Sequence, residues 1–178
     1  MSEITERKSL LIYSMEGGAW LGGYLVLRFI CSVAGTLSPL FDALALLMFA
    51  FTPFVLYYIM LRYHRENGYL SGFSLLWMMG IMLFFFASLI CAIPEYVFYQ
   101  YINPDYIANA MTQSVKLIED MGLMQNDETY NQMRQLIEEG TTPTALQMIM
   151  SSMWSNVFFG SLLSIVVAPI VTRKKNKA

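Results

Sequence analysis

Charged residues are scarce in this sequence: Asp, Glu, Lys and Arg together make up 13% of its 178 residues. A soluble domain of this size carries about twice that fraction. Hydrophobic residues, by contrast, reach 56%, and they gather in long blocks, which is typical of segments that cross a lipid bilayer. The scarcity of charge argues against a soluble domain. The lack of a basic field argues against a nucleic-acid-binding surface.

Histidine and cysteine are almost absent. His64 is the only histidine and lies in a basic loop, residues 62–68, that is expected after the second span. We therefore expect neither a histidine-based metal site nor a nucleophile–histidine pair. The two cysteines, Cys31 and Cys91, fall within apolar blocks and lack the clustered spacing of a zinc or disulfide framework. We expect their thiols to be buried and to pack as small hydrophobic groups. The sequence therefore predicts no catalytic residues, no metal, no cofactor and no enzymatic activity.

Four apolar blocks are long enough to cross a membrane as helices. A helix needs about 20 apolar residues to span about 30 Å of hydrocarbon. One uncharged run, residues 73–93, lies in the stretch from Gly68 to Asp105 around which the chain is organised. We expect spans at about 10–35, 40–61, 70–94 and 150–171. The predicted fold is all-α, a polytopic membrane protein whose residues 1–178 form a single membrane domain.

Proline marks two features of the second span. Pro39 follows a very short turn, and because proline disfavours helix at the residue before it, the first two spans should form a tight antiparallel hairpin. Pro53 lies in the middle of the second span. A kink is expected there, tolerated because neighbouring groups satisfy the freed carbonyl.

One segment, residues 103–143, has the composition of a water-exposed helical hairpin. Asn103, Pro104 and Asp105 form a helix start with a capping side chain, a proline and an acid. Apolar residues then recur at helical spacing, namely Ile107, Met111, Val115 and Ile118. A second helix is expected to begin near residues 126–128, and Thr142 and Pro143 should start the last helix.

Basic residues are segregated to one side of the predicted membrane protein. Four spans place both termini and the segment between the second and third spans on the same side of the membrane. That side carries eight basic residues: Arg7, Lys8, Arg62, Arg65, Arg173, Lys174, Lys175 and Lys177. The segment 103–143 carries only Lys116 and Arg134 among its acids. Because positive charge is retained in the cytoplasm, we expect both termini to be cytoplasmic in the bacterial inner membrane and residues 103–143 to be periplasmic.

Small residues form stripes on the first and last spans. The first stripe consists of Ser14, Gly18 and Gly22, and the second of Gly160, Ser164 and Ala168. Small side chains at a spacing of four let two helices approach closely in lipid. We expect both stripes to be helix-packing surfaces and the second to be a natural partner of the first. Whether the first meets this chain or a partner subunit stays open.

Charged residues inside the spans are the candidates for function, since burying charge in hydrocarbon is costly. Arg28, Asp42 and Glu95 all fall near the outer ends of their spans. They could form one layer that holds a lipid phosphate or an ion. The alternative is a structural ion pair, or side chains that extend to the headgroups.

Glu16 lies deeper, about 9 Å along the first span at the helical rise, where the sequence offers no basic partner. It would be the proton-carrying residue of a transporter. The alternative is a satisfied polar contact, for example with Ser164 of the last span.

The stretch around the third span resembles a known family. The segments Gly68–Ser74, Gly-Tyr-Leu-Ser-Gly-Phe-Ser, and Tyr96–Tyr106, Tyr-Val-Phe-Tyr-Gln-Tyr-Ile-Asn-Pro-Asp-Tyr, are similar to those of a bacterial four-span membrane protein family, domain of unknown function four-one-nine-nine. The likeness covers nearly the whole chain. It supplies no catalytic residues. Because members are often encoded near a polyprenyl-phosphate glycosyltransferase, it implies a lipid-linked sugar pathway as the setting.

Together these features predict a non-enzymatic integral membrane protein that binds a membrane lipid, another membrane protein or a second copy of itself in a homo-oligomer. The alternative is a small transporter, or a translocation factor for an ion or a polyprenyl-phosphate-linked lipid. Glu16 or Arg28 would then carry the activity.

Overall fold

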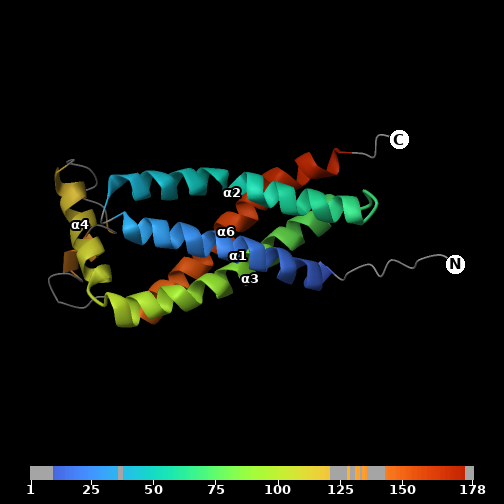
Figure 1. Ribbon diagram of the computed structural model, residues 1–178. Helices are drawn as coiled ribbons and strands as arrows, with labels where there is room; N and C mark the ends of the chain where they lie inside the picture. The colour runs from blue at the N-terminus through green and yellow to red at the C-terminus, as the bar shows by residue number, and fades with distance from the viewer. Residues whose placement is uncertain are drawn as a thin grey trace. The chain divides into compact units, whose positions relative to one another are not determined.

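The computed structural model describes residues 10–35, 38–120, 128, 131–132, 134–135 and 143–174. Its helices are α1 (Leu10–Ala34), α2 (Pro39–Glu66), α3 (Phe73–Val97), the π-helix η1 (Phe98–Ile102), α4 (Tyr106–Asp120) and α6 (Ala145–Thr172) (Figure 1). Four helices are long and apolar enough to cross a membrane: α1, α2, α3 continued by η1, and α6. The all-α, four-span prediction is therefore confirmed. Most of the helix expected after residue 126 lies outside the described residues.

The chain forms two compact units. The first contains residues 1–93 and 152–178, and the second contains residues 94–151. The first unit thus holds α1, α2, most of α3 and most of α6. The second holds the end of α3, η1, α4 and the first residues of α6.

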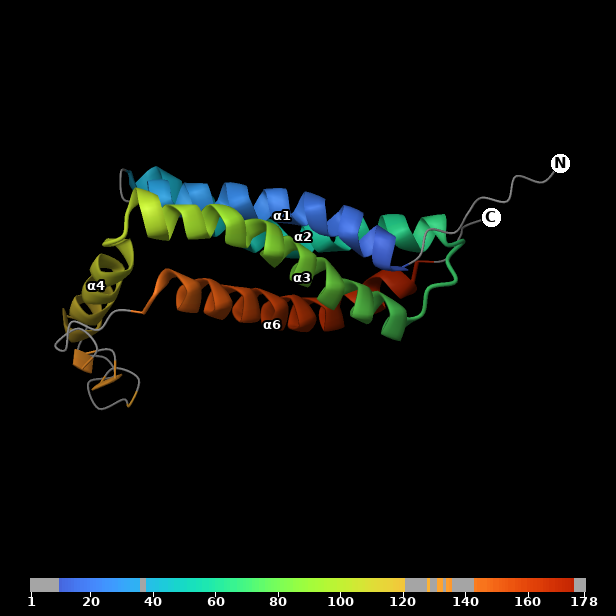
Figure 2. The same cartoon turned by 90° about the horizontal axis from the view of Figure 1, so that it is seen from below.

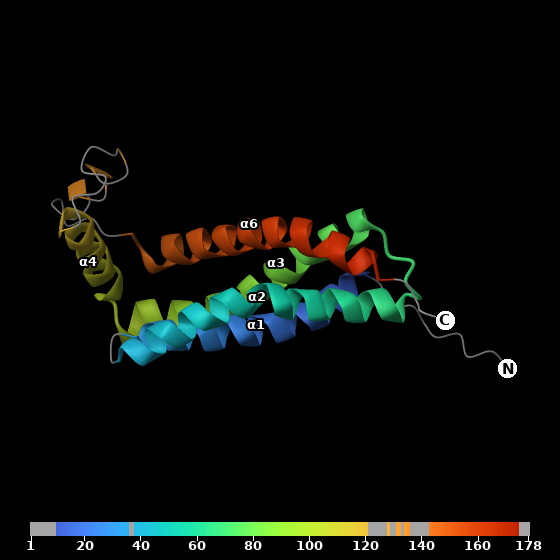
Figure 3. The same cartoon turned by 90° about the horizontal axis from the view of Figure 1, so that it is seen from above.

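Within the first unit, the start of α1 and the ends of α2 and α6 share one end (Figures 1 and 3). The rings of Tyr13 in α1 and Tyr63 in α2 lie 4.9 Å apart between centroids. Nε2 of His64 lies 3.2 Å from the carbonyl oxygen of Lys174, which follows α6. The described basic residues of the α2 and α6 ends therefore gather at this end: Arg62, Arg65, Arg173 and Lys174.

The helices α1 and α2 form the tight antiparallel hairpin that the sequence predicted. Ser38 caps α2, because its hydroxyl accepts a bond from the N–H of Leu40 at 3.5 Å, and Pro39 opens the helix. An added Cβ on Gly35 would lie 1.7 Å from Oδ1 of Asp42. Glycine at position 35 therefore lets the backbone after α1 lie close to the Asp42 carboxylate.

The second helix is longer than the sequence indicated. It continues past Leu61 to Glu66, so His64 lies in its last turn and not in a loop. The imidazole is 1% exposed and contacts Tyr69 edge-on, with 5.2 Å between centroids. The expectation of a loop histidine was wrong because Arg62 and Arg65 can extend from a helix end into water while His64 faces inward.

The core of the first unit surrounds α3. Six hydrophobic residues of α3 are each at most 3% exposed: Leu76, Met79, Leu83, Phe84, Ala87 and Cys91. Figures 2 and 3 show α3 crossing from the side of α1 and α2 towards α6. Both cysteines are buried, as predicted, and no disulfide joins them. The third span is thus the helix against which the others pack.

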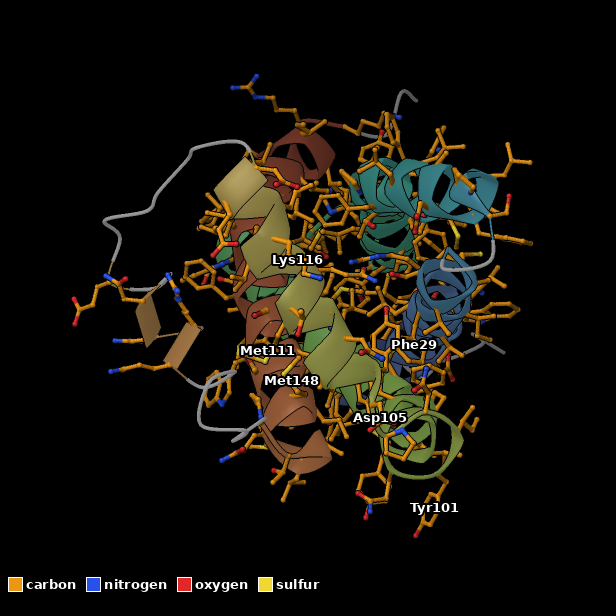
Figure 4. The ribbon with its side chains drawn as sticks, turned by 90° about the vertical axis from the view of Figure 1, so that its left-hand side faces the viewer. Phe29, Tyr101, Asp105, Met111, Lys116 and Met148 are labelled. Carbon is orange, nitrogen blue, oxygen red and sulfur yellow. The ribbon has the colours of Figure 1, made fainter. Side chains whose placement is uncertain are left out.

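The second unit contains an amphipathic helix, α4. Ile107 and Val115 are buried, as their spacing predicted, and Figure 4 shows Met111 and Lys116 farther along the helix than Asp105. The start of α4 is later than expected. The N–H of Asn103 bonds to the carbonyl of Phe98 at 2.9 Å, so Asn103 ends η1, and α4 begins at Tyr106.

The first turn of α6 also begins later than the sequence indicated, at Ala145. Thr144 supplies the cap: its hydroxyl accepts from the N–H of Gln147 at 3.3 Å, and the side-chain oxygen of Gln147 accepts from the N–H of Thr144 at 2.9 Å. This reciprocal pair is a capping box. Pro143 therefore precedes the cap and is not the first helical residue.

Candidate functional site

Among the described Asp, Glu, Lys and Arg side chains of the first unit, Arg28 differs from the others because it is not exposed. The side chain is half-buried, and its Cζ atom lies 4.9 Å from the ring centroid of Phe49 in α2. A guanidinium over an aromatic face is held by cation–π attraction. This contact fixes one face of the guanidinium and leaves its N–H edge for other partners.

Arg28 lines a cavity of about 210 Å³ that is bounded by α1, α2, α3 and α6. Its polar lining consists of Arg28, Thr52, Ser152, Ser155 and Asn156. None of the described residues that line it is acidic. Hydroxyl and amide groups can donate hydrogen bonds to an anion beside the guanidinium. The cavity is therefore suited to an anionic oxygen ligand more than to a cation.

The cavity lies near one end of the first unit. At about 1.5 Å per residue, Arg28 is about 27 Å along α1 from Leu10. Hydrocarbon is about 30 Å thick, so a helix that starts at one boundary brings Arg28 close to the other. Residues 152–156, which line the cavity from α6, are the first of that helix in this unit.

The other two charges of the expected layer have different surroundings. Asp42 is exposed, approaches Gly35 at the α1–α2 turn and does not line the Arg28 cavity. Glu95 belongs to the second unit and is 6% exposed. A single site built from Arg28, Asp42 and Glu95 stays a prediction.

Glu16 lies on another side of α1. It is exposed and lines a groove of about 890 Å³ between α1 and α2, together with Arg62 of α2. The sequence offered no basic partner at this depth because Arg62 was assigned to a loop. The longer α2 brings it to the same groove. Glu16 and Arg28 thus line separate hollows.

The suggested contact between Glu16 and Ser164 is wrong. The Ser164 hydroxyl is buried and donates to the carbonyl of Gly160 at 2.6 Å. An added Cβ on Gly80 of α3 would lie 1.9 Å from Ser164 Oγ. Ser164 therefore lies against α3, away from the α1–α2 groove.

Both small-residue stripes face α3 and not each other, which corrects the predicted pairing. Added Cβ atoms on Gly18 and Gly22 would lie 2.6 Å and 3.0 Å from Cβ atoms of Phe86 and Ile90. On the other side, Gly160 would meet the ring of Phe84 at 2.1 Å. Ser14 and Ala168 are fully buried at the ends of the stripes.

Sequence reasoning missed Gly80 and Thr52. Gly80 is the only glycine within the run 73–93, which was a usable signal for a close helix contact. Thr52 donates to the carbonyl of Met48 at 3.2 Å, and Tyr24 donates to the same carbonyl. These hydroxyls bind a carbonyl one turn before Pro53, which lies inside the continuous helix α2 and lacks a backbone N–H of its own.

The described residues offer no metal centre, since no three His, Cys, Asp or Glu side chains among them come together. A model for a family described as "Protein of unknown function (DUF4199)" matches residues 17–173 of the chain. Neither the curated proteins nor the solved structures give a match.

Proposed function

Since the chain belongs to the DUF4199 family of proteins of unknown function, we propose its role from the Arg28 cavity: it is a non-enzymatic, multi-pass membrane protein that binds the phosphate of a membrane lipid. The observation that carries this proposal is the half-buried guanidinium in a cavity with hydroxyl and amide groups but no acidic residue among its described lining.

Phosphate fits the donors of this cavity. A guanidinium presents a planar fork of N–H groups that matches two phosphate oxygens, and the bonds are strengthened by charge. Phe49 supports the flat face of Arg28 at 4.9 Å, so the fork is oriented before a ligand arrives. The side chains of Ser155 and Asn156 line the same cavity and add neutral donors.

A lipid fits better than free phosphate because the cavity has an apolar part. Phe84, Phe159 and Leu163 line it beside the polar groups. An acyl chain can pack against them, and because lipid tails are as apolar as these side chains, the gain comes from close packing and not from leaving water. Inorganic phosphate would leave these side chains without a partner.

The orientation of the protein follows from its charges. The described basic residues Arg62, Arg65 and Lys174 lie at the ends of α2 and α6, away from Arg28. Because such residues stay in the cytoplasm, we place this end, with both termini, on the cytoplasmic side of the inner membrane. Residues 103–143 are then periplasmic, and Arg28 serves a lipid of the outer leaflet.

The test measures how tightly the detergent-purified protein binds phosphatidylglycerol and phosphatidylcholine, using native mass spectrometry of the wild type and Arg28→Gln. A hydrogen bond to a charged group is worth about 1.5–3 kcal/mol. Arg28→Gln should therefore weaken phospholipid binding about tenfold or more. Arg28→Lys should give an intermediate loss, because an ammonium retains the charge but not the fork.

Arg65→Gln is the matched control, since Arg65 is an exposed arginine at the other end of the unit. Its lipid affinity should equal that of the wild type. Equal loss in both variants would show only a general dependence on charge. Unchanged binding in Arg28→Gln, with an unchanged melting temperature, would refute the proposal.

A further inference from the structure

A second hollow lies between α1 and α2. The groove of about 890 Å³ is lined by Ala19, Trp20, Gly23 and Leu27 of α1, among others. An added Cβ on Gly23 would meet nothing within 4 Å, so the floor of the groove is open. Trp20 is 79% exposed beside it. This groove is separate from the Arg28 cavity.

Charges occur at only one end of the groove. Glu16, Arg62 and the hydroxyls of Tyr13 and Tyr58 line that end. Nε of Arg62 bonds to Oε1 of Glu66 at 3.0 Å, and an arginine has further N–H groups on its two terminal nitrogens. Two carboxylates thus accompany one guanidinium there. The remainder of the groove is apolar apart from the hydroxyl of Tyr24 and the indole N–H of Trp20.

Arg62 lies at the depth of lipid headgroups, and Glu16, about 9 Å along α1 from Leu10, lies inside that boundary. The 28 residues of α2 are about 42 Å long at the helical rise. This exceeds the hydrocarbon thickness of about 30 Å, so about 6 Å extends beyond each boundary when the helix is centred. Arg62, four residues before the end of α2, then lies at the boundary itself.

We propose that this groove binds a phospholipid whose headgroup carries both a phosphate and a primary ammonium group. The phosphate contacts Arg62, the ammonium contacts Glu16, and one acyl chain lies over Gly23 towards Leu27. A lipid carries its charges only at the boundary and is apolar elsewhere, which is the distribution of charge along this groove.

The headgroup class follows from charge and hydrogen bonding. A headgroup with phosphate alone would add negative charge beside the carboxylates of Glu16 and Glu66. A choline headgroup supplies a positive charge but no N–H donor for Glu16. Only a headgroup with phosphate and primary ammonium pairs with both signs of charge and donates to the carboxylate.

The test uses Trp20 as a reporter of the lipid in the groove. The Trp77→Phe, Trp154→Phe double variant keeps Trp20 as its only tryptophan. In nanodiscs of mixed lipids, the quenching of Trp20 fluorescence is compared for brominated phosphatidylethanolamine, phosphatidylcholine and phosphatidylglycerol. Exposed ion pairs are worth about 0.2–1 kcal/mol. The ethanolamine lipid should therefore compete for the Trp20 position up to about fivefold better than the other two. Glu16→Gln should remove this preference.

A matched reporter is available in α6. Trp154 is 71% exposed and is not among the residues that line the groove, so a Trp20→Phe, Trp77→Phe protein should show no headgroup preference. Gly23→Leu fills open space and should reduce quenching of Trp20 by all three lipids. A Cβ added at Gly23 meets no atom within 4 Å, so we expect the fold to be retained, which the melting temperature of the variant checks.

Three outcomes would overturn the proposal. Equal quenching of Trp20 by the three lipids would show an ordinary lipid-facing surface. Equal preference at Trp20 and Trp154 would show a bulk membrane effect. Little quenching at Trp20, together with a dimer in solution, would show that a second copy of the chain covers the groove. Arg28→Gln should leave the Trp20 preference unchanged, which separates this site from the Arg28 cavity.

Discussion

The third and second spans are almost equally apolar but have different roles in the fold. Their most apolar windows have mean hydropathies of 2.4 for α3 and 2.1 for α2. Inside the protein, however, 44% of the α3 window is buried, against 22% for α2. Hydropathy therefore identifies both as spans without indicating which is central.

The difference comes from the small residues on neighbouring helices. Lipid tails are as apolar as leucine, so helices associate in a bilayer through close packing. Glycines of α1 and α6 lie against α3: Gly18 and Gly22 contact Phe86 and Ile90, and Gly160 contacts Phe84. The second span contains no glycine. In this protein the position of glycines, more than hydrophobicity, distinguishes the central helix.

The largest effect on stability is expected for Gly80→Leu in α3, which tests whether close packing makes α3 the central helix. An added Cβ would lie 1.9 Å from Ser164 Oγ and 2.7 Å from Cε of Met60. Overpacking of this kind typically costs about 1–3 kcal/mol, and we expect the upper part of that range because α6 must move. The measurement is reversible unfolding in mixed micelles, followed by circular dichroism.

Gly23→Leu is the control for that experiment, since a Cβ added at Gly23 meets no atom within 4 Å and leucine has a higher helix propensity than glycine. Its stability should match or exceed that of the wild type. If both substitutions were equally harmless, close packing at the crossing of α3 and α6 would not determine which helix is central.

A second, smaller effect is expected when leucine is shortened. Leu83 in α3 is fully buried, whereas Leu46 in α2 is 69% exposed. Leu83→Ala should lower the free energy of unfolding by about 2 kcal/mol, the low end of the range for leucine-to-alanine cavities. The loss is at the low end because the unfolded helices stay in lipid, so only packing contacts are lost and no side chain is transferred to water. Leu46→Ala should be close to neutral. Thermal unfolding of the two variants in one detergent would reveal the difference, and equal losses would contradict it.

Much of the fold was predictable because lipid imposes a strong constraint. Backbone groups must be satisfied internally, so an apolar block of sufficient length becomes a helix. The hairpin at Pro39 and the buried face of α4 followed from local rules. Helix ends were less predictable: α2 continues to Glu66 because Arg62 and Arg65 tolerate a helical position at the boundary, where their long side chains reach water.

The candidate site was predictable only in part. The position of Arg28 in the first span predicts its depth in the membrane, and that depth made Arg28 a candidate functional residue. Its neighbours Phe49 and Asn156 come from helices whose rotation is fixed by packing on α3, and no local pattern encodes that rotation. The same limit explains Ser164, whose stripe was recognised but assigned to α1. Gly80, the glycine of the central span, was the overlooked clue.

The smallest test concerns a polar contact between α3 and α6. The indole Nε1 of Trp77 donates to Ser161 Oγ at 3.3 Å. Hydrogen bonds between membrane helices average about 0.6 kcal/mol in double-mutant cycles. A cycle of Trp77→Phe, Ser161→Ala and the double variant should give a coupling of about that size, measured by unfolding in micelles. This coupling energy is well below the loss of stability expected for Gly80→Leu. Comparing the two values shows whether close packing or hydrogen bonding holds α6 to α3. A coupling of several kcal/mol would give that role to the hydrogen bond.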